Sequence, residues 1–406
     1  MTILKFLIEK RSVLAFGLIL TFFSSFGQTF LVSLYVPDIL EKFDLTKSSF
    51  GSIYSLATVF SGFTIVFVGK QIDQRPLRAF TLFTAFGLIA ATFLISIAHG
   101  LVMLFISLAG LRLFGQGLLS LIAQTTMARS FDVGRGKALS IAMIGYPLGE
   151  AFLPIIVTAL IGTIGWRWSW GASSLFILVA LIPFVLFLSR DAVKADHKAR
   201  YKAEKDESDV DQVTQLSLFK DPTFLMVIWA VLMAPFLLTA LLLYQVPMAE
   251  MKGWTAEWIA TSFIGFAVAR IIFSLTSGLL VDRFSARILF PFYLIPLVAG
   301  VFLLTTGNNA VLAPIYLFLL GVSAGAGGSI KSAMWAELYG VAKLGAVKSL
   351  AATLMILSTA AAPFLMGYLL EVPNIDLNLI FHGVIVMVLI SSVLSGIGIY
   401  RKTALA

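Results

Sequence analysis

Twelve long apolar runs, separated by polar loops, constrain the fold of this chain more than any other feature. A helix needs roughly 20 apolar residues to cross the hydrocarbon core of a bilayer. The chain is 59% hydrophobic and 12% charged, whereas soluble domains are about 25% charged. The sequence therefore predicts an all-α membrane protein with twelve transmembrane helices and excludes a soluble fold. The runs cover residues 12–36, 48–69, 77–98, 101–127, 137–163, 168–188, 222–247, 256–280, 287–307, 310–334, 345–370 and 378–400.

One long polar stretch, residues 189–221, divides the apolar runs six and six. It is rich in Lys, Asp, Glu and Arg and has no apolar face long enough to cross a membrane. We therefore predict an N-terminal six-helix bundle at residues 1–188, a cytoplasmic linker at 189–221 and a C-terminal six-helix bundle at 222–406.

The two halves repeat a loop motif in which a Gly is followed by an Asp and then by an Arg at the same spacing. Internal repeats in the two halves of a membrane protein are typical of transporters, with the pathway at the interface between the repeats. We therefore predict two pseudo-symmetric bundles around a central pathway. The motif residues are Gly69, Asp73 and Arg78 in the first half and Gly278, Asp282 and Arg287 in the second.

The distribution of Lys and Arg predicts the orientation, because cytoplasmic loops are enriched in these residues. Only Lys42, Lys47, Arg167 and Lys252 fall on the opposite side of the spans. Both termini and the linker are therefore expected in the cytoplasm. The first apolar run is too long for a signal peptide, and no Asn-X-Ser/Thr glycosylation site occurs. We expect a multi-pass protein of the bacterial inner (cytoplasmic) membrane.

Several functions are excluded by what the sequence lacks. There is no Cys, so neither a disulfide nor a thiolate metal site can form. No Walker motif, metal-ligand cluster or nucleophile constellation is present, so we expect no enzyme activity, no metal and no cofactor. The net charge of +8 lies in loops between spans, which predicts a lipid bilayer as partner and no nucleic acid. We expect a monomer.

Four stretches resemble the major facilitator superfamily of secondary transporters. Gly69–Arg78 and Gly278–Arg287 resemble its loop signature Gly-x-x-x-Asp-Arg-x-x-Gly-Arg, Arg112–Gly117 its fourth span, and Gly165–Trp168 the start of its sixth span. The resemblance implies two six-helix bundles that open the pathway alternately to the two sides of the membrane. The signature is incomplete here, because Gln74 replaces an Arg, and Leu77 and Ala286 replace the later Gly.

The resemblance also implies that the repeated loops are gates. Asp73 is expected to meet the start of span 11 and Asp282 the start of span 5, with Arg78, Arg287 and Arg129 as possible ion-pair partners. A Gly at the helix end, Gly69 or Gly278, would let a neighbouring helix approach. The alternative interpretation is a charge cluster that only sets topology.

Three ionisable residues lie deep in the spans: Arg112, Glu150 and Arg270. Such a residue costs about 2.5–3.5 kcal/mol at the centre of a span, so a functional role is expected. Arg112 and Glu150 lie about 22 and 20 Å from the cytoplasmic face, counting 1.5 Å per residue, which predicts an ion pair. Its role is either structural or proton-coupling, with Glu150 as the proton carrier. Lys331 is expected to extend toward the cytoplasm.

Arg270 has no acid at its depth within its own half of the sequence. A guanidinium matches the two oxygens of a carboxylate, and the resemblance adds that monocarboxylate and oxalate transporters use a span 8 arginine. We therefore expect a small organic anion as substrate. The alternative is that backbone carbonyls or Glu150 satisfy Arg270. Further candidates for substrate contact are Arg112, Gln28, Tyr146 and Tyr244.

Together these features predict a secondary active transporter that moves a small organic anion, a carboxylate in particular, by proton-coupled alternating access. Two alternatives remain open. A multidrug or siderophore efflux transporter would favour an acidic, aromatic cavity over Arg270. A non-transporting membrane sensor or assembly partner would show no substrate flux and would tolerate loss of the gate acids.

Overall fold

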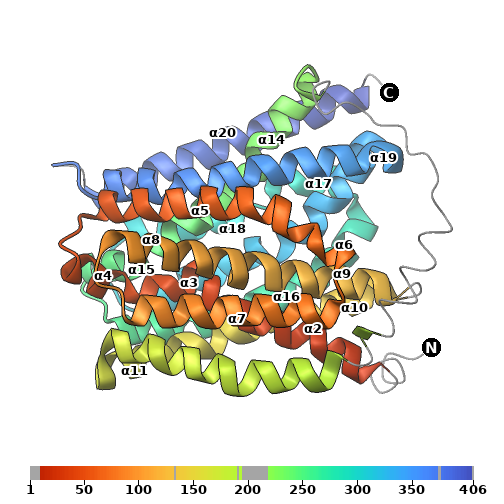
Figure 1. Cartoon of the computed structure of the whole chain (residues 1–406). Coiled ribbons are helices and arrows are strands. Elements are labelled where there is room, and N and C mark those ends of the chain that lie inside the picture. Colours follow the sequence, from red (N-terminus) through yellow and green to blue (C-terminus); the bar gives the residue numbers. More distant parts are fainter. Residues whose placement is uncertain (1–9, 132–133, 190–191, 194–217, 374–375, 405–406) are drawn as a thin grey trace. The chain divides into compact units, whose positions relative to one another are not determined.

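The computed structural model describes residues 10–131, 134–189, 192–193, 218–373 and 376–404, and the secondary structure of these residues is helical throughout (Figure 1). Within them the chain forms two compact units, one of Met1–Asp44 with Leu56–Ser208 and the other of Leu45–Ser55 with Asp209–Ala406. Most of the predicted linker lies outside the described residues. The predicted boundaries at residues 188 and 222 remain a prediction. The sequence did not suggest that residues 45–55 would group with the second unit.

The spans lie where hydropathy predicted them. Ten described helical runs are long and apolar enough to cross a membrane. An eleventh span is the bent pair Arg11–Gly27 and Thr29–Lys42, which meet at 42°. The run Gly136–Ser189 holds two spans, because the chain turns at Gly165, where φ is 79°. The prediction of twelve transmembrane helices is confirmed.

Unit 1 has its first span in several short pieces and its other spans as long helices. In Figure 1, α7 and α11 run side by side, and α2 packs against α9, α10 and α11. The elements are α2 (Arg11–Phe23), η1 (Ser24–Gly27), α3 (Thr29–Val32), η2 (Ser33–Tyr35), α4 (Val36–Lys42), most of α5 (Lys47–Gly69), α6 (Gln71–Gln74), α7 (Leu77–Ser96), α8 (Leu101–Gly110), η3 (Leu111–Leu119), α9 (Ser120–Ser130), α10 (Arg135–Met143), α11 (Gly145–Phe176) and η4 (Ile177–Leu181).

Unit 2 is built around its longest helical run, α19, against which α14, α16 and α18 pack. That run turns at Gly340, where φ is 73°, and so forms two spans. The elements are α14 (Pro222–Leu243), α15 (Gln245–Met251), α16 (Ala256–Phe284), α17 (Ala286–Leu289), η5 (Phe290–Phe292), α18 (Ile295–Thr305), α19 (Leu312–Leu369) and α20 (Leu377–Ala404).

Large apolar side chains cover the outside of both units. Phe67 is 70% exposed, Phe187 is 73% exposed and Val102 is 72% exposed. In water a surface of this kind would promote association, whereas hydrocarbon solvates it at no such cost. The exposed side chains are therefore those of a multi-pass membrane protein.

Asp221 contacts three helices of unit 2, namely α14, α19 and α20. Its carboxylate caps α14 by accepting a hydrogen bond from the Thr223 N–H at 2.8 Å. It also accepts one from the Tyr339 hydroxyl at 2.7 Å and pairs with Lys402 Nζ at 3.1 Å. Burial alone would raise the pKa of Asp221, but these hydrogen bonds and the Lys402 charge lower it below its ordinary value.

We expect Asp221→Asn to lower the unfolding temperature of the purified protein at neutral pH. Because the folded-state pKa is below the unfolded one, the stabilisation is present above the ordinary Asp pKa and is lost as pH falls below it. The wild type should therefore lose stability between about pH 5 and pH 3, with a smaller change in the variant. Asp221→Ala, which also removes the cap, should cost about 1 kcal/mol more. Profiles of stability against pH that run parallel for Asp221→Asn and the wild type would contradict this prediction. The control is Glu250→Gln, because Glu250 is exposed.

Candidate functional site

The first span is broken at the depth of the buried charges. Helix α2 ends at Phe23, η1 follows, and Gln28 is extended, with φ −81° and ψ 149°, before α3 begins. A Cβ atom on Gly27 would lie 2.0 Å from the Leu111 carbonyl oxygen and 2.5 Å from the Gln116 nitrogen. Only glycine therefore allows the broken segment to lie directly on the backbone of η3. Gln28, a predicted substrate contact, is part-buried at the break.

The segment facing this break, η3, is π-helical, a widened helix that is frequent at functional sites. Arg112 lies in its first turn and is only 6% exposed. Its Nη1 donates a hydrogen bond to the Thr29 hydroxyl at 3.1 Å. Gln116 Oε1 is also buried and has no hydrogen-bond partner among the described residues. Unit 1 therefore has polar side chains, Arg112 and Gln116, in its interior beside the break in the first span.

Glu150 reaches the same region from α11. A Cβ on Gly145 would lie 2.1 Å from the Thr21 hydroxyl, and one on Gly149 would lie 2.1 Å from the Ser25 hydroxyl. These two glycines, four residues apart, therefore let α11 contact the first span directly. Glu150 follows at once and is 4% exposed.

Arg112 and Glu150 thus lie on two helices that contact the same broken segment. Their direct ion pair remains a prediction. Tyr146, another predicted substrate contact, is buried on α11 between the two glycines.

The predicted gate in unit 1 holds one ion pair. Arg129, in the last turn of α9, donates to the Asp73 carboxylate of α6, which confirms Arg129 among the three arginines considered. Arg78 is exposed. A Cβ on Gly69 would lie 3.0 Å from the Leu121 side chain, so α5 and α9 approach closely there, as expected. A Cβ on Gly278 would meet no atom within 4 Å, and the approach of a helix at Gly278 stays a prediction.

The corresponding loop of unit 2 uses an acid that the sequence did not single out. The Glu337 carboxylate accepts hydrogen bonds from the Ser285 hydroxyl at 2.6 Å and from the backbone N–H groups of Ala286 and Arg287. Arg287 Nε lies 3.7 Å from the same carboxylate. The pairing of Arg287 with Asp282, considered from the sequence, is therefore replaced by Arg287–Glu337, and Asp282 lies exposed. In unit 2 the loop supplies the arginine and the helix end supplies the acid. In unit 1 the loop supplies the acid, Asp73, and the helix end supplies Arg129.

The N-terminal end of α5 forms a second tight contact, within unit 2. Glu371 accepts hydrogen bonds from both the N–H and the hydroxyl of Ser48. The Tyr244 hydroxyl lies 2.8 Å from the Lys47 carbonyl oxygen and 3.0 Å from that of Pro363. Tyr244 is fully buried, so the structure gives this predicted substrate contact a role in joining helices.

Arg270 lies midway along α16, where this helix contacts α19. A Cβ on Gly325 would lie 2.5 Å from the Arg270 carbonyl oxygen, and one on Gly321 would lie 2.3 Å from that of Phe266. Arg270 is part-buried. Every described acidic residue of unit 2 lies near a helix end, and none lies at this depth; they are Asp221, Glu250, Glu257, Asp282, Glu337, Glu371 and Asp376.

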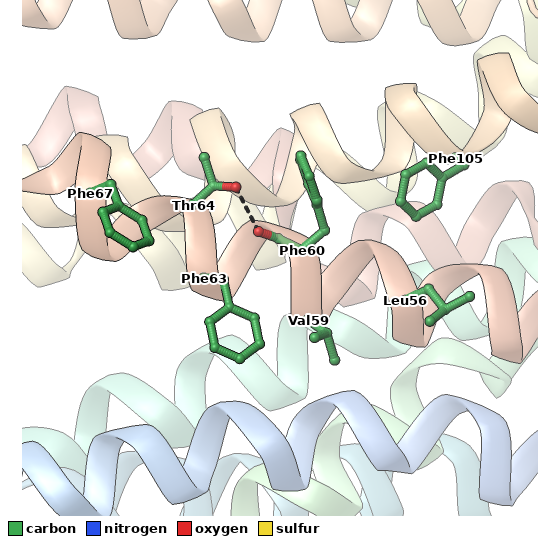
Figure 2. Close-up of a pocket in the computed structure, with 7 residues that line it drawn as sticks. All are labelled: Leu56, Val59, Phe60, Phe63, Thr64, Phe67 and Phe105. Carbon is green, nitrogen blue, oxygen red and sulfur yellow. Dashed lines mark hydrogen bonds between the residues drawn. The ribbon is translucent and has the colours of Figure 1, made fainter.

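A hollow of about 430 Å³ on α5 and α8 offers nothing polar to a substrate (Figure 2). Thr64 supplies its one hydroxyl, which already donates to the Phe60 carbonyl oxygen at 2.7 Å. The Phe60 and Phe105 rings meet edge to face at 6.1 Å. Such a surface suits hydrocarbon. The lining residues are Leu56, Val59, Phe60, Phe63, Thr64, Phe67 and Phe105.

Twelve spans, a broken first span and buried ionisable residues at mid-membrane define a membrane transport protein. The sequence model of the Major Facilitator Superfamily matches residues 17–269. The chain is 26% identical over 337 residues to the MFS transporter asaE of Aspergillus flavus, covering 80% of this chain and 72% of that protein. This protein belongs to the major facilitator superfamily and is a transporter, not an enzyme.

Solved transporters share the fold at low sequence identity. The xylose transporter XylE from E. coli, in an inward-open conformation, superposes with a TM-score of 0.70 at 13% identity, covering 94% of each chain. The nucleoside transporter NupG gives a TM-score of 0.70 at 13% identity, over 97% of this chain and 99% of that one. The predicted all-α fold of the superfamily is confirmed.

We expect Gly27→Ala to destabilise unit 1, because its Cβ would overlap backbone atoms of η3. Overpacking of this kind costs about 1–3 kcal/mol. The matched control is Gly162→Ala in α11, where a Cβ meets open space. Thermal unfolding of the purified variants should show a lower transition for Gly27→Ala and an unchanged or higher one for Gly162→Ala. Equal transitions would contradict the close contact between the first span and η3.

Proposed function

We propose that this transporter moves a small organic anion, a carboxylate in particular, across the bacterial inner membrane by proton-coupled alternating access. One observation carries the proposal: a cation, Arg270, lies midway along a span of unit 2, while every described acid of that unit lies near a helix end. A guanidinium at this depth would attract an anionic substrate.

The chemistry of the guanidinium supports a carboxylate. Its planar fork donates two parallel hydrogen bonds to the two oxygens of a carboxylate, which adds orientation to the charge attraction. Gly325 supports this arrangement, because it brings the backbone of α19 against that of Arg270 and so fixes the position of α16.

Glu150 is the proposed proton carrier. It is a carboxylic acid that is 4% exposed, in a membrane span, next to glycines that hold α11 on the broken first span. Protonation would remove its charge and with it the attraction to a nearby cation such as Arg112. Proton binding would thereby change which arrangement of the first span is favoured. Arg112, Gln28 and Tyr146 complete the proposed pathway lining in unit 1.

The gate proposal rests on the ion pairs at the cytoplasmic helix ends. Arg129–Asp73 in unit 1 and Arg287–Glu337 in unit 2 each tie a loop to the end of a span. We assign Gly69, Arg78, Gly278 and Asp282 to the same gate because they belong to the repeated loops. In this proposal both termini face the cytoplasm and the protein acts as a monomer.

A multidrug exporter is the second candidate, and the aromatic hollow on α5 favours it. Its phenylalanines would suit an apolar substrate, whereas Arg270 would have no ligand in that mechanism. The two candidates differ in the charge of the compound that binds.

We expect purified protein to be stabilised against heat by carboxylates and not by amines or sugars at matched ionic strength. Arg270→Gln should abolish the stabilisation, because it removes the charge while keeping a polar side chain. Lys220→Gln, an exposed cation outside the spans, is the control. Stabilisation by amines instead, or an Arg270→Gln variant with wild-type response to every carboxylate, would refute the proposal.

A further inference from the structure

One face of α5 carries an apolar stripe that ends in a lysine. The stripe lines the hollow of about 430 Å³ on α5 and α8 (Figure 2). Lys70 follows Phe67 by three residues and has helical backbone angles, φ −60° and ψ −24°, so it lies on the same side of the helix. The apolar members, at intervals of four, three and four residues, are Leu56, Phe60, Phe63 and Phe67.

The stripe is about as long as one leaflet of a bilayer is thick. Leu56 lies near the middle of α5, and Phe67 follows it eleven residues later, which is about 17 Å along the axis at 1.5 Å per residue. Half of the hydrocarbon core measures about 15 Å. Lys70 lies about 4–5 Å beyond Phe67, so its ammonium group reaches the level of the lipid phosphates. The hollow therefore follows the path of an acyl chain from mid-membrane to the headgroups.

The lining of the hollow accepts hydrocarbon and gives a polar ligand no anchor. Phe63 is 64% exposed and Phe67 is 70% exposed, so both rings are open to contact. The Thr64 hydroxyl is already bonded to the Phe60 carbonyl oxygen at 2.7 Å. A ligand held in one orientation here must therefore be anchored at the end of the stripe, at Lys70.

The loop at that end carries more cations than acids. Lys70 and Arg75 are exposed, and Arg75 Nε donates to Gln71 Oε1 at 3.4 Å. Asp73, the acid of this loop, is paired with Arg129. The phosphate of an anionic lipid would complement this charge. The other described acids of unit 1 either precede α5 or lie inside a span; they are Asp38, Glu41, Asp44 and Glu150.

We propose that this face of α5 and α8 binds one anionic phospholipid, with an acyl chain in the hollow and the phosphate at Lys70 and Arg75. The inference does not depend on the proposed anion transport, because the lipid is a resident partner and not the substrate. A zwitterionic phospholipid carries a positive group beside its phosphate, which weakens its attraction to the two cations. An apolar substrate would fill the hollow but make no use of the cations.

The test is native mass spectrometry of the full-length protein in detergent with equal amounts of phosphatidylglycerol and phosphatidylcholine of the same acyl chains. The wild type should retain phosphatidylglycerol at least about tenfold more, since each Lys or Arg near an anionic lipid contributes a factor of about five. Lys70→Gln should lower this ratio about fivefold. Lys42→Gln, an exposed lysine at the end of α4, is the matched control and should keep the wild-type ratio.

A second variant tests the hollow itself. Thr64→Phe adds a ring to the hollow and should lower the retention of both lipids, because either acyl chain needs the same space. Thr163→Phe is the matched control, because Thr163 is exposed on α11 and also bonds within its own helix, to the Ala159 carbonyl oxygen at 2.8 Å. It should retain lipid like the wild type.

Equal retention of the two lipids by the wild type, or an unchanged ratio in Lys70→Gln, would overturn the inference. Displacement of the bound lipid by tetraphenylphosphonium, an apolar cation, from the wild type but not from Thr64→Phe would make the hollow a substrate site and overturn it too. A dimer that Thr64→Phe dissociates would assign the hollow to a second copy of the chain, with the same consequence. Carboxylate binding is measured separately through Arg270→Gln, so failure here leaves the proposed function standing.

Discussion

The free-energy cost of placing a charged side chain in hydrocarbon constrains how the helices of this protein can pack. Among the residues that the structure describes, Arg112, Glu150, Arg270 and Lys331 are charged side chains well inside spans, and each lies beside an irregular or unusually close helix contact. The first span breaks at Gln28 beside Arg112. Hydrogen bonding and water access in such places lower the penalty that each charge would otherwise carry.

Glycines at helix contacts make these arrangements possible. Hydrophobic burial gives little drive for helices to associate inside a bilayer, so small residues that permit close packing become decisive. Gly27 and Gly149 bring the first span onto η3 and α11, while Gly325 brings α19 onto α16 at Arg270. In both units, close helix contacts at glycine therefore lie beside an ionisable residue inside a span.

The spans could be predicted from the sequence because membrane thickness and hydropathy act locally along the chain. Arg129 was one of three possible partners for Asp73, and the structure selected it. The break at Gln28, the role of Glu337 and the direction of Lys331, which extends back over Gly327 and away from the Gly340 end, could not be predicted. Each depends on which atoms a neighbouring helix presents: η3 at Gly27, the Ser285 turn at Glu337, and the space left by Gly327 at Lys331.

The central claim is that anion binding at Arg270 is coupled to protons through Glu150. It is tested most directly by radiolabelled succinate uptake into proteoliposomes, with and without an imposed inward proton gradient. The account predicts that the proton gradient accelerates succinate uptake by the wild type. The Glu150→Gln variant should still exchange labelled for unlabelled succinate, at a rate that does not change with the gradient. Gradient-driven accumulation by Glu150→Gln equal to that of the wild type would contradict the account.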